Sequence, residues 1–428
     1  MITLYLGSIN RSGASLFARL MDGHPDVASY PKEFAFPNNH KIAPSLESIT
    51  GIPRYVPSFK ELKNDIFKLT DTVEHKVDPV YKWGKEKSDS VGVRKNYLEK
   101  EFYGKVKTDF DFELFTSEFK RLVSQANNVN DIWDARHKAY FKAWEDNKYS
   151  GSMKYIVWHD SAGFYLSNHS KYFEEFSDSF WIYPLREIYG FIASEKTRIA
   201  RRFYGSRRFP KIKMNNYLVK KFNQYDLDAH INSWLSAFTR VYMFQKAYGV
   251  NNRFIVYSYE NLVNDTESVM KSISNKIGLD YNSSLLNPTI AGNSWGGSSH
   301  QGKQKGVNSK LSSYYKEVLT IEEINKIDKL SKTLTKYLRD SDSTPIDLSS
   351  INKKDLFDYE YQSRFFEDED KTAMYSYIIN ANRRRVIVSP PSFSSIFAYI
   401  YSKIIRIIHI PRLLKQRLFP ALGKQNYT

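Results

Sequence analysis

The strongest constraint on the fold lies in the first 25 residues. An apolar run at 2–6 predicts a buried strand, a loop that contains Gly7 and Gly13 follows it, and the apolar positions of 16–21 predict a helix. Gly23 and Pro25 are expected to end that helix. A strand, a tight loop and a helix in this order aim the unpaired first amides of the helix at the loop. The segment therefore predicts an anion site for phosphate or sulfate.

The loop differs from those that bind nucleoside triphosphates. Most such loops carry a lysine directly after the second glycine, whereas this chain has Ala14 there. Arg11 is the only cation of the loop, and Ser12 and Ser15 supply hydroxyls. This composition argues against an ATPase or a kinase.

Two later segments repeat the pattern of a strand followed by a polar residue and a helix. The aromatic and β-branched run 180–183 predicts a strand with Arg186 at its carboxyl end, and Ser194 lies eight positions later on the next helix. Residues 253–257 predict another strand, which continues into 259–263 and then a helix to Gly278. A loop rich in glycine, serine and lysine occupies 292–307. Arg186 as a plain surface charge and 292–307 as a plain surface loop remain the alternatives.

In this order the three segments resemble the sulfotransferases that use 3′-phosphoadenosine-5′-phosphosulfate (PAPS). The Arg-Ser-Gly of 11–13 and the His-Pro-Asp of 24–26 resemble the Golgi-type and bacterial branch, which includes carbohydrate and tyrosylprotein sulfotransferases. The resemblance covers residues 2 to about 307. It implies a P-loop-like three-layer α/β fold, with a mostly parallel central sheet flanked by helices, a helical insertion and a helical C-terminal tail.

The resemblance also implies site residues. It assigns the 5′-phosphosulfate to the first loop and the 3′-phosphate to Arg186 and Ser194, because an arginine fork and a helix hydroxyl can reach the same oxygens. The chain departs from the family where Glu187-Ile188 replaces Asp-Pro and where Pro184 enters the strand. The full cofactor set is Asn10, Arg11, Ser12, Gly13, Ala14, Ser15, Arg186, Ser194, Tyr257, Lys303, Lys305 and Gly306.

Sulfuryl transfer needs a base for the acceptor proton and cations for the migrating charge, but no metal. Arg11 and the loop amides are expected to supply the positive charge. Glu33 is the first candidate base, because the family places a glutamate shortly after His-Pro-Asp-Val, although here it comes one residue later. His159, at the end of the predicted strand 155–158, is the second, since histidine titrates in the useful range. A base other than these two remains open.

The expected organisation is a catalytic domain at 1–345 and an extension at 346–428. Within the domain, 53–150 is an insertion with helices at 110–127 and 131–144, which either binds the acceptor or is structural. In the extension, 392–418 reads as a basic amphipathic helix, which either lies on an anionic membrane or packs against the domain or a second copy.

Composition limits the partners. Zero cysteines among 428 residues exclude a disulfide framework and thiol-based zinc sites. Because the first strand begins at residue 1 or 2, we expect no signal peptide and a cytoplasmic protein.

A net charge of +16 favours anionic partners, and basic residues gather at Arg198, Arg201, Arg202, Arg207 and Arg208. Nucleic acid is the rival partner, disfavoured because no nucleic-acid module is recognisable. A glycan is the preferred acceptor, with a lipid headgroup or a peptide tyrosine as alternatives.

Overall fold

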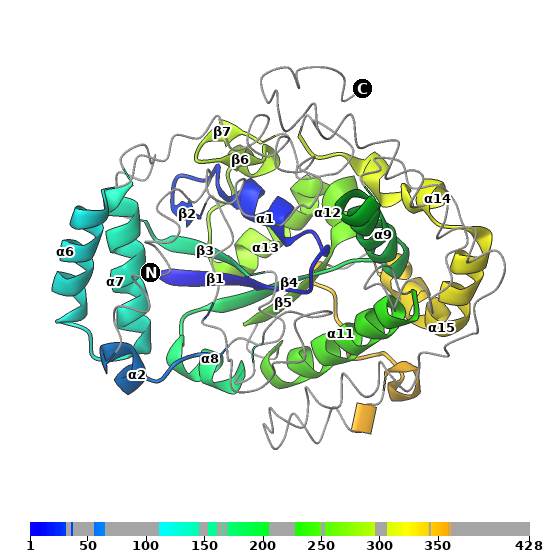
Figure 1. The fold of residues 1–428 in the computed structure, drawn as a ribbon, viewed down its shortest axis with the longest axis horizontal. Coiled ribbons are helices and arrows are strands. Elements are labelled where there is room, and N and C mark those ends of the chain that lie inside the picture. The colour runs from blue at the N-terminus through cyan, green and yellow to red at the C-terminus, as the bar shows by residue number, and fades with distance from the viewer. Residues whose placement is uncertain are drawn as a thin grey trace.

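The computed structural model describes residues 1–30, 36, 55–64, 111–144, 153–160, 166, 169–204, 227–249, 253–295, 306–341, 344–357 and 359–360. Within these ranges a five-stranded parallel sheet has the order β2-β3-β1-β4-β5 (Figure 1). Its strands are β1 (Ile2–Gly7), β2 (Val27–Ser29), β3 (Tyr155–Asp160), β4 (Phe180–Leu185) and β5 (Phe254–Ser258). A short antiparallel hairpin joins β6 (Thr289–Ile290) to β7 (Asn293–Ser294).

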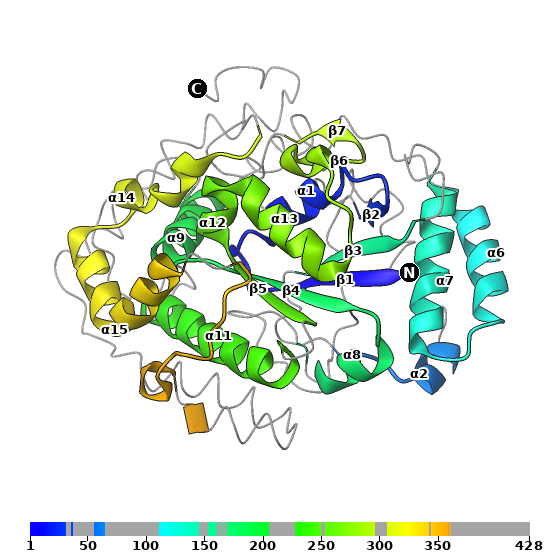
Figure 2. The same ribbon diagram turned by 180° about the vertical axis from the view of Figure 1, so that it is seen from behind.

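Helices cover both faces of the sheet (Figures 1 and 2). One face carries α1 (Ala14–Met21), α12 (Tyr259–Asn264) and α13 (Thr266–Ile277). The other carries α8 (His169–Glu175) and α11 (Leu227–Tyr248). This burial on both faces explains why the strands are nearly continuous apolar runs rather than alternating ones. The predicted α/β fold with a mostly parallel sheet is confirmed.

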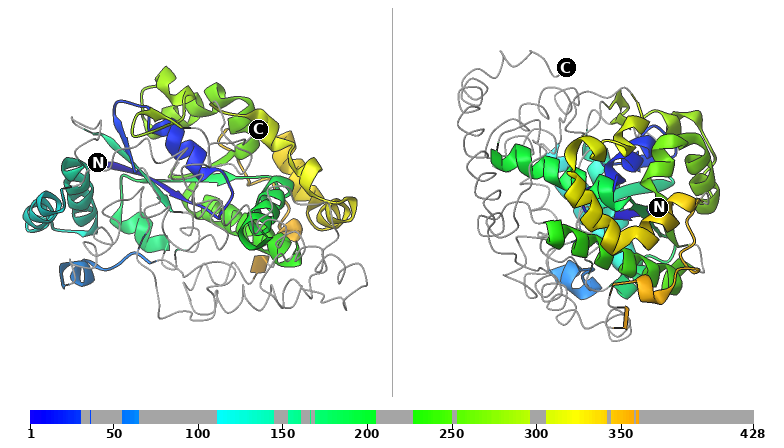
Figure 3. Two further views of the ribbon diagram at one scale, coloured as in Figure 1. Left: turned by 45° about the horizontal axis from the view of Figure 1, so that its top comes forward. Right: turned by 90° about the vertical axis from the view of Figure 1, so that its right-hand side faces the viewer.

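Further helices lie at the two ends of the sheet (Figure 3). At one end are α2 (Phe59–Asn64), α6 (Phe112–Val123) and α7 (Val129–Ala143), and at the other are α14 (Tyr315–Val318) and α15 (Ile321–Asp340), which pack with α9 (Ile188–Tyr204). Single 3-10 turns occupy Ser283–Leu286, Ser309–Ser312 and Lys353–Asp355. Within the predicted insertion at 53–150, α6 and α7 are the two helices expected at 110–127 and 131–144. Their starts are set by Asp111 and Asn128, whose side chains accept backbone amides of the first turn.

The order of the strands positions the site. Strand β1 is central, and the chain places β2 and β3 on one side of it before it crosses to β4 and β5 on the other. Ligands of open parallel sheets bind outside the carboxyl ends of the strands where this reversal occurs. The loops after β1 and β4 meet at that point, so the glycine-rich loop and Arg186 lie at the same edge of the sheet.

Strand β4 tolerates Pro184 because its pairing with β1 ends before this residue. The two strands pair only at Leu4 with Phe180 and at Tyr5 with Trp181, whereas β4 pairs with β5 as far as Leu185. On the β1 side Pro184 therefore lies beyond the last paired residue, where a missing N–H removes no ladder bond.

Aromatic packing fixes the middle of the sheet. The rings of Trp158, Tyr172 and Trp181 surround Tyr5 with centroid distances of 5.4, 5.1 and 5.0 Å. The Nε1 of Trp181 also donates to the Gly7 carbonyl at 2.8 Å, which joins β4 to the last residue of β1. The start of the glycine-rich loop is therefore anchored in the core.

Packing continues past the boundary expected at residue 345. The Ile346 amide donates to the Val256 carbonyl of β5 at 2.8 Å, and Leu348 and Phe357 are buried in the same core. The predicted amphipathic helix at 392–418 lies outside the described residues, as does everything after residue 360. None of the described helices combines the length and apolar character needed to cross a bilayer.

Candidate functional site

The glycine-rich loop has the backbone expected of an anion-binding loop. Arg11 and Gly13 both have positive φ, 70° and 100°, and Gly13 is the N-cap of α1 without a side-chain hydrogen bond to it. The first amides of α1 are therefore left for a ligand. Ser12 is buried, and its hydroxyl donates to the Ile9 carbonyl at 2.8 Å, so this side chain closes the loop.

Position 13 needs a glycine both because of its positive φ and because a neighbouring aromatic ring leaves no room for a Cβ. A Cβ at this position would lie 2.2 Å from Cδ2 of Tyr259, the first residue of α12. The Tyr259 ring thus lies directly on the loop. Its other neighbour is Arg186, whose guanidinium carbon is 4.4 Å from the ring centroid in a cation–π contact.

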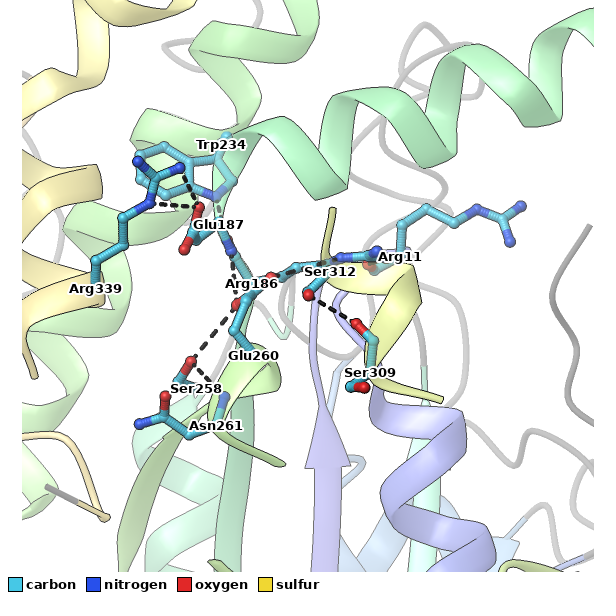
Figure 4. Close-up of polar contacts among 10 residues, drawn as sticks. All are labelled: Arg11, Arg186, Glu187, Trp234, Ser258, Glu260, Asn261, Ser309, Ser312 and Arg339. Carbon is cyan, nitrogen blue, oxygen red and sulfur yellow. Dashed lines mark hydrogen bonds and ion pairs between the residues drawn. The ribbon is translucent and has the colours of Figure 1, made fainter. Parts of the chain in front are cut away.

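Arg186 lies between the glycine-rich loop and Glu260 (Figure 4). Its side chain is 13% exposed, and Nη1 donates to the Arg11 carbonyl of the loop at 3.1 Å. The buried Nε has no hydrogen-bond partner, and the nearest carboxylate oxygen, Oε1 of Glu260, is 4.0 Å away. An arginine has five N–H donors, and the hydrogen bond to Arg11 uses one of them, so Arg186 keeps donors with which it can bind an anion.

Glu260 is a buried carboxylate in an unusual state. Its Oε2 accepts from the Glu187 amide at 3.2 Å and from the Ser258 hydroxyl at 3.5 Å, while Oε1 has no hydrogen bond. Burial raises the pKa of Glu260 to about 7, and the nearby charge of Arg186 only partly opposes this rise. A carboxylate in this state can gain a proton near neutral pH.

The backbone that carries Arg186 is held from two sides. Trp234 of α11 donates through Nε1 to the Arg186 carbonyl at 2.8 Å. The next residue, Glu187, accepts both Nε and Nη2 of Arg339 from α15, at 3.0 and 2.8 Å. Gly190 leaves room for the side chain, because a Cβ there would lie 2.8 Å from the Arg186 Nε. The arginine is therefore preorganised.

Arg11 points away from Arg186 in Figure 4. Its Nε forms an ion pair with Oε1 of Glu195 on α9 at 3.1 Å, and its side chain is 22% exposed. Ser194 precedes Glu195 on α9 and is partly exposed. The pair Arg11–Glu195 therefore ties the stretch of α9 that carries Ser194 to the glycine-rich loop.

His24 and Asp22 have structural roles. The His24 Nδ1 accepts the Asp26 amide at 3.1 Å, so its Nε2, 2.9 Å from the Asp280 carbonyl, is the donor. Asp22 accepts the Thr289 hydroxyl at 2.6 Å and the Gly292 amide at 3.1 Å. These contacts fasten the end of α1 to segments that lie more than 250 residues later.

The remaining predicted residues fall into four groups. His159 ends next to the loop, because its partner in the β1–β3 ladder is Leu6, and it is 5% exposed. Tyr257 is not brought to the site, since it is fully buried and its ring packs 5.2 Å from that of Phe17. Gly306 is exposed, with a φ of 68°. Glu33, Lys303, Lys305, Arg207 and Arg208 lie outside the described residues.

Several residues of this site had no role that was expected from the sequence. Tyr259 and Glu260 follow directly after β5, and their place at the carboxyl end of a strand was the available signal. Glu195, Trp234 and Arg339 had no such signal, because each reaches the site from a helix through a contact distant in sequence. Among the described residues, no three His, Asp or Glu side chains form a group that could hold a metal.

Comparison with known proteins gives matches to solved structures alone. No family model and no curated protein matches the chain. The chain is similar to the sulfotransferase domain of the Synechococcus PCC 7002 olefin synthase, with 15% identity, a TM-score of 0.39, and coverage of 77% of this chain and 94% of that one. It is also similar to the sulfotransferase domain of the curacin biosynthetic pathway, with 14% identity, a TM-score of 0.40, and coverage of 77% of this chain and 97% of that one. A third similar structure is the sulfotransferase STF9 of Mycobacterium avium, with 13% identity, a TM-score of 0.32, and coverage of 81% of this chain and 78% of that one. Because these TM-scores lie below 0.5, function has to be inferred from the residues of this chain.

Proposed function

We propose that the chain is a sulfotransferase that binds PAPS and transfers its sulfuryl group to a hydroxyl acceptor, for which a glycan is our first choice. The observation that carries this proposal is Arg186. Its side chain is mostly buried, stacks on Tyr259 and donates to the glycine-rich loop, yet its Nε has no hydrogen-bond partner. A buried and unsatisfied donor next to an anion-binding loop fits a ligand with two anionic groups.

The two groups of PAPS would use different parts of the site. The loop from Asn10 to Ser15 and the first amides of α1 suit the 5′-phosphosulfate, and Arg186 with Ser194 suits the 3′-phosphate. Bound PAPS supplies a sulfuryl group on a good leaving group. Transfer then forms a bond between the acceptor oxygen and sulfur, breaks the bond between sulfur and the phosphate oxygen, and moves the acceptor proton to a base.

Arg11 would act on the sulfuryl group in this reaction, although its side chain also pairs with a carboxylate. In this structure its Nε is paired with Oε1 of Glu195 at 3.1 Å, and its side chain is 22% exposed, so a ligand in the loop would compete with Glu195 for the charge of Arg11. The loop amides and Arg11 together would stabilise the negative charge that spreads over the sulfuryl oxygens.

The cofactor part of the proposal is tested by calorimetric binding of adenosine 3′,5′-bisphosphate, AMP and ATP. Wild-type protein should bind the bisphosphate at micromolar or tighter affinity and bind AMP and ATP much more weakly. Arg186→Ala should weaken bisphosphate binding by roughly ten- to hundredfold, since a charged hydrogen bond contributes ~1.5–3 kcal/mol. Arg121→Ala, at an exposed ion pair on α6, is the control and should bind normally. Equal affinities for AMP and the bisphosphate would contradict the assignment.

The base is tested by comparing Glu33→Gln with His159→Ala in a transfer assay. If Glu33 is the base, its variant keeps bisphosphate affinity and loses turnover by on the order of 10²–10⁴. If Glu33→Gln turns over normally and His159→Ala does not, His159 takes the role. Full turnover by both variants would exclude both.

The acceptor is tested by transfer of labelled sulfate from PAPS to fractionated saccharides, lipids and peptides of the source cell. Label in saccharides supports the glycan proposal, whose motivation is the 15% aromatic content that suits stacking on sugar rings. Label in lipids or in peptide tyrosines would replace the glycan with that class.

A further inference from the structure

Three Arg–Glu pairs surround the centre of the site, and they differ in the distance between the guanidinium and the carboxylate. Arg339 and Glu187 form a forked pair at 2.8 and 3.0 Å, and Arg11 and Glu195 pair at 3.1 Å. The third pair, Arg186 and Glu260, is separated by 4.0 Å and shares no hydrogen bond. Among the described residues, Arg186 and Glu260 are thus the pair nearest to the expected phosphate, and they are also the pair with the largest separation.

We propose that Glu260 is a positioning residue that balances the charge of Arg186 before a phosphate binds, and that it takes up one proton from solvent when the phosphate arrives. This inference rests on the proposed function, because it needs a phosphate at Arg186. The proton converts the carboxylate to a carboxylic acid, so the site exchanges the negative charge of Glu260 for that of the phosphate.

The physical reason is the approach of two like charges in a buried space. A phosphate bound to the guanidinium of Arg186 would compete for its positive charge with Oε1 of Glu260, which lies 4.0 Å from the Nε. Anions this close cannot both stay ionised without a large cost, and the group with fewer stabilising contacts is the one that gains the proton. Oε1 has no hydrogen bond to lose, and once protonated it has a hydrogen to donate to a phosphate oxygen.

The other groups around Glu260 reinforce this direction. From the start of α9, Glu187 adds a second negative charge, which is itself paired with Arg339 of α15. Tyr259 of α12 and Ser258 of β5 are neutral, and Ser309 and Ser312 lie nearby in Figure 4. Arg186 is the one cation that faces the carboxylate directly among the described residues. The pKa of Glu260, raised to about 7 mainly by burial, places this carboxyl group near the midpoint of its titration at neutral pH.

The test is titration calorimetry of full-length protein with adenosine 3′,5′-bisphosphate at pH 7.5–8, in two buffers of different ionisation enthalpy. The difference in heat between the buffers gives the number of protons taken up. Wild-type protein should take up roughly 0.5–1 proton per bisphosphate, and its affinity should be about fivefold weaker at pH 8 than at pH 7. The ligand takes up no proton in this range, because a phosphate monoester titrates near pH 6.

Two variants complete the test. Glu260→Gln should bind without proton uptake and without the weakening above pH 7, whereas Glu267→Gln, at an exposed carboxylate on α13, should behave as wild type. If wild-type protein binds the bisphosphate without proton uptake, the inference is overturned even if Glu260→Gln does not fold. Uptake that persists in Glu260→Gln overturns it as well. No binding by wild-type protein refutes the proposed function itself, which separates the two failures.

Discussion

Replacement of Gly13 by alanine tests whether the Tyr259 ring and the glycine-rich loop depend on each other. Alanine at a φ of 100° is strained, which costs about 1–2 kcal/mol. The new Cβ would also lie 2.2 Å from the ring, so the ring or the loop must move, and such overpacking costs about 1–3 kcal/mol. The free energy of unfolding of Gly13→Ala should therefore fall by about 2–5 kcal/mol, as measured by urea denaturation.

Gly278→Ala is the matched control. Gly278 also has a positive φ, 72°, but the nearest atom to a Cβ there is the Tyr155 hydroxyl at 3.7 Å. This variant should lose only the conformational part, about 1–2 kcal/mol. The difference between the two variants isolates the collision with the ring.

A double-mutant cycle with Tyr259→Ala then locates the collision. Without the ring, Gly13→Ala should cost only its conformational part, which gives a coupling energy of about 1–3 kcal/mol. Displacement of the ring should also weaken bisphosphate binding, because Arg186 stacks on it. If Gly13→Ala costs no more than Gly278→Ala, or costs the same with and without Tyr259, the reasoning is refuted.

Two further variants separate stability from binding. Gly190→Ala should keep or raise stability, since alanine is favoured over glycine in a helix by about 1 kcal/mol, yet it should weaken bisphosphate binding because its Cβ displaces Arg186; unchanged affinity in calorimetry would contradict this. Glu260 has a folded-state pKa of about 7, above its ordinary 4.5, so its contribution to stability is full below pH 4.5 and is lost as the pH rises through 7. Glu260→Gln avoids this loss, so its free energy of unfolding relative to wild type should rise by on the order of 3 kcal/mol between pH 4.5 and pH 8. Urea denaturation at the two pH values measures this difference. A difference that stays constant with pH would contradict the raised pKa of Glu260.

The sequence predicted those parts of the fold that depend on local chemistry. The strand 2–6, the loop with Gly13 and the helix that ends before Gly23 were recognisable because glycine placement and apolar periodicity act over a few residues. Arg186 was recognisable from its place after a strand. The partners of these residues were not, because Glu195, Trp234 and Arg339 come from helices whose packing is decided by the whole chain. Tyr257 is fully buried and packs against Phe17, so its place in the cofactor set stays a prediction that rests on the sequence alone.

The sulfotransferases that the sequence resembles carry Asp-Pro where this chain has Glu187-Ile188, and the start of α9 accommodates the difference. Ile188 is the first residue of this helix, a position whose N–H needs no intrahelical partner and where proline and other residues both fit. The residue before it, Glu187, accepts the Phe191 amide through its carbonyl at 3.0 Å, as an N-cap does. An aspartate there would use its short side chain to cap the helix. The longer glutamate reaches Arg339 instead, so in this chain the segment that carries Arg186 is braced by α15 rather than by its own helix.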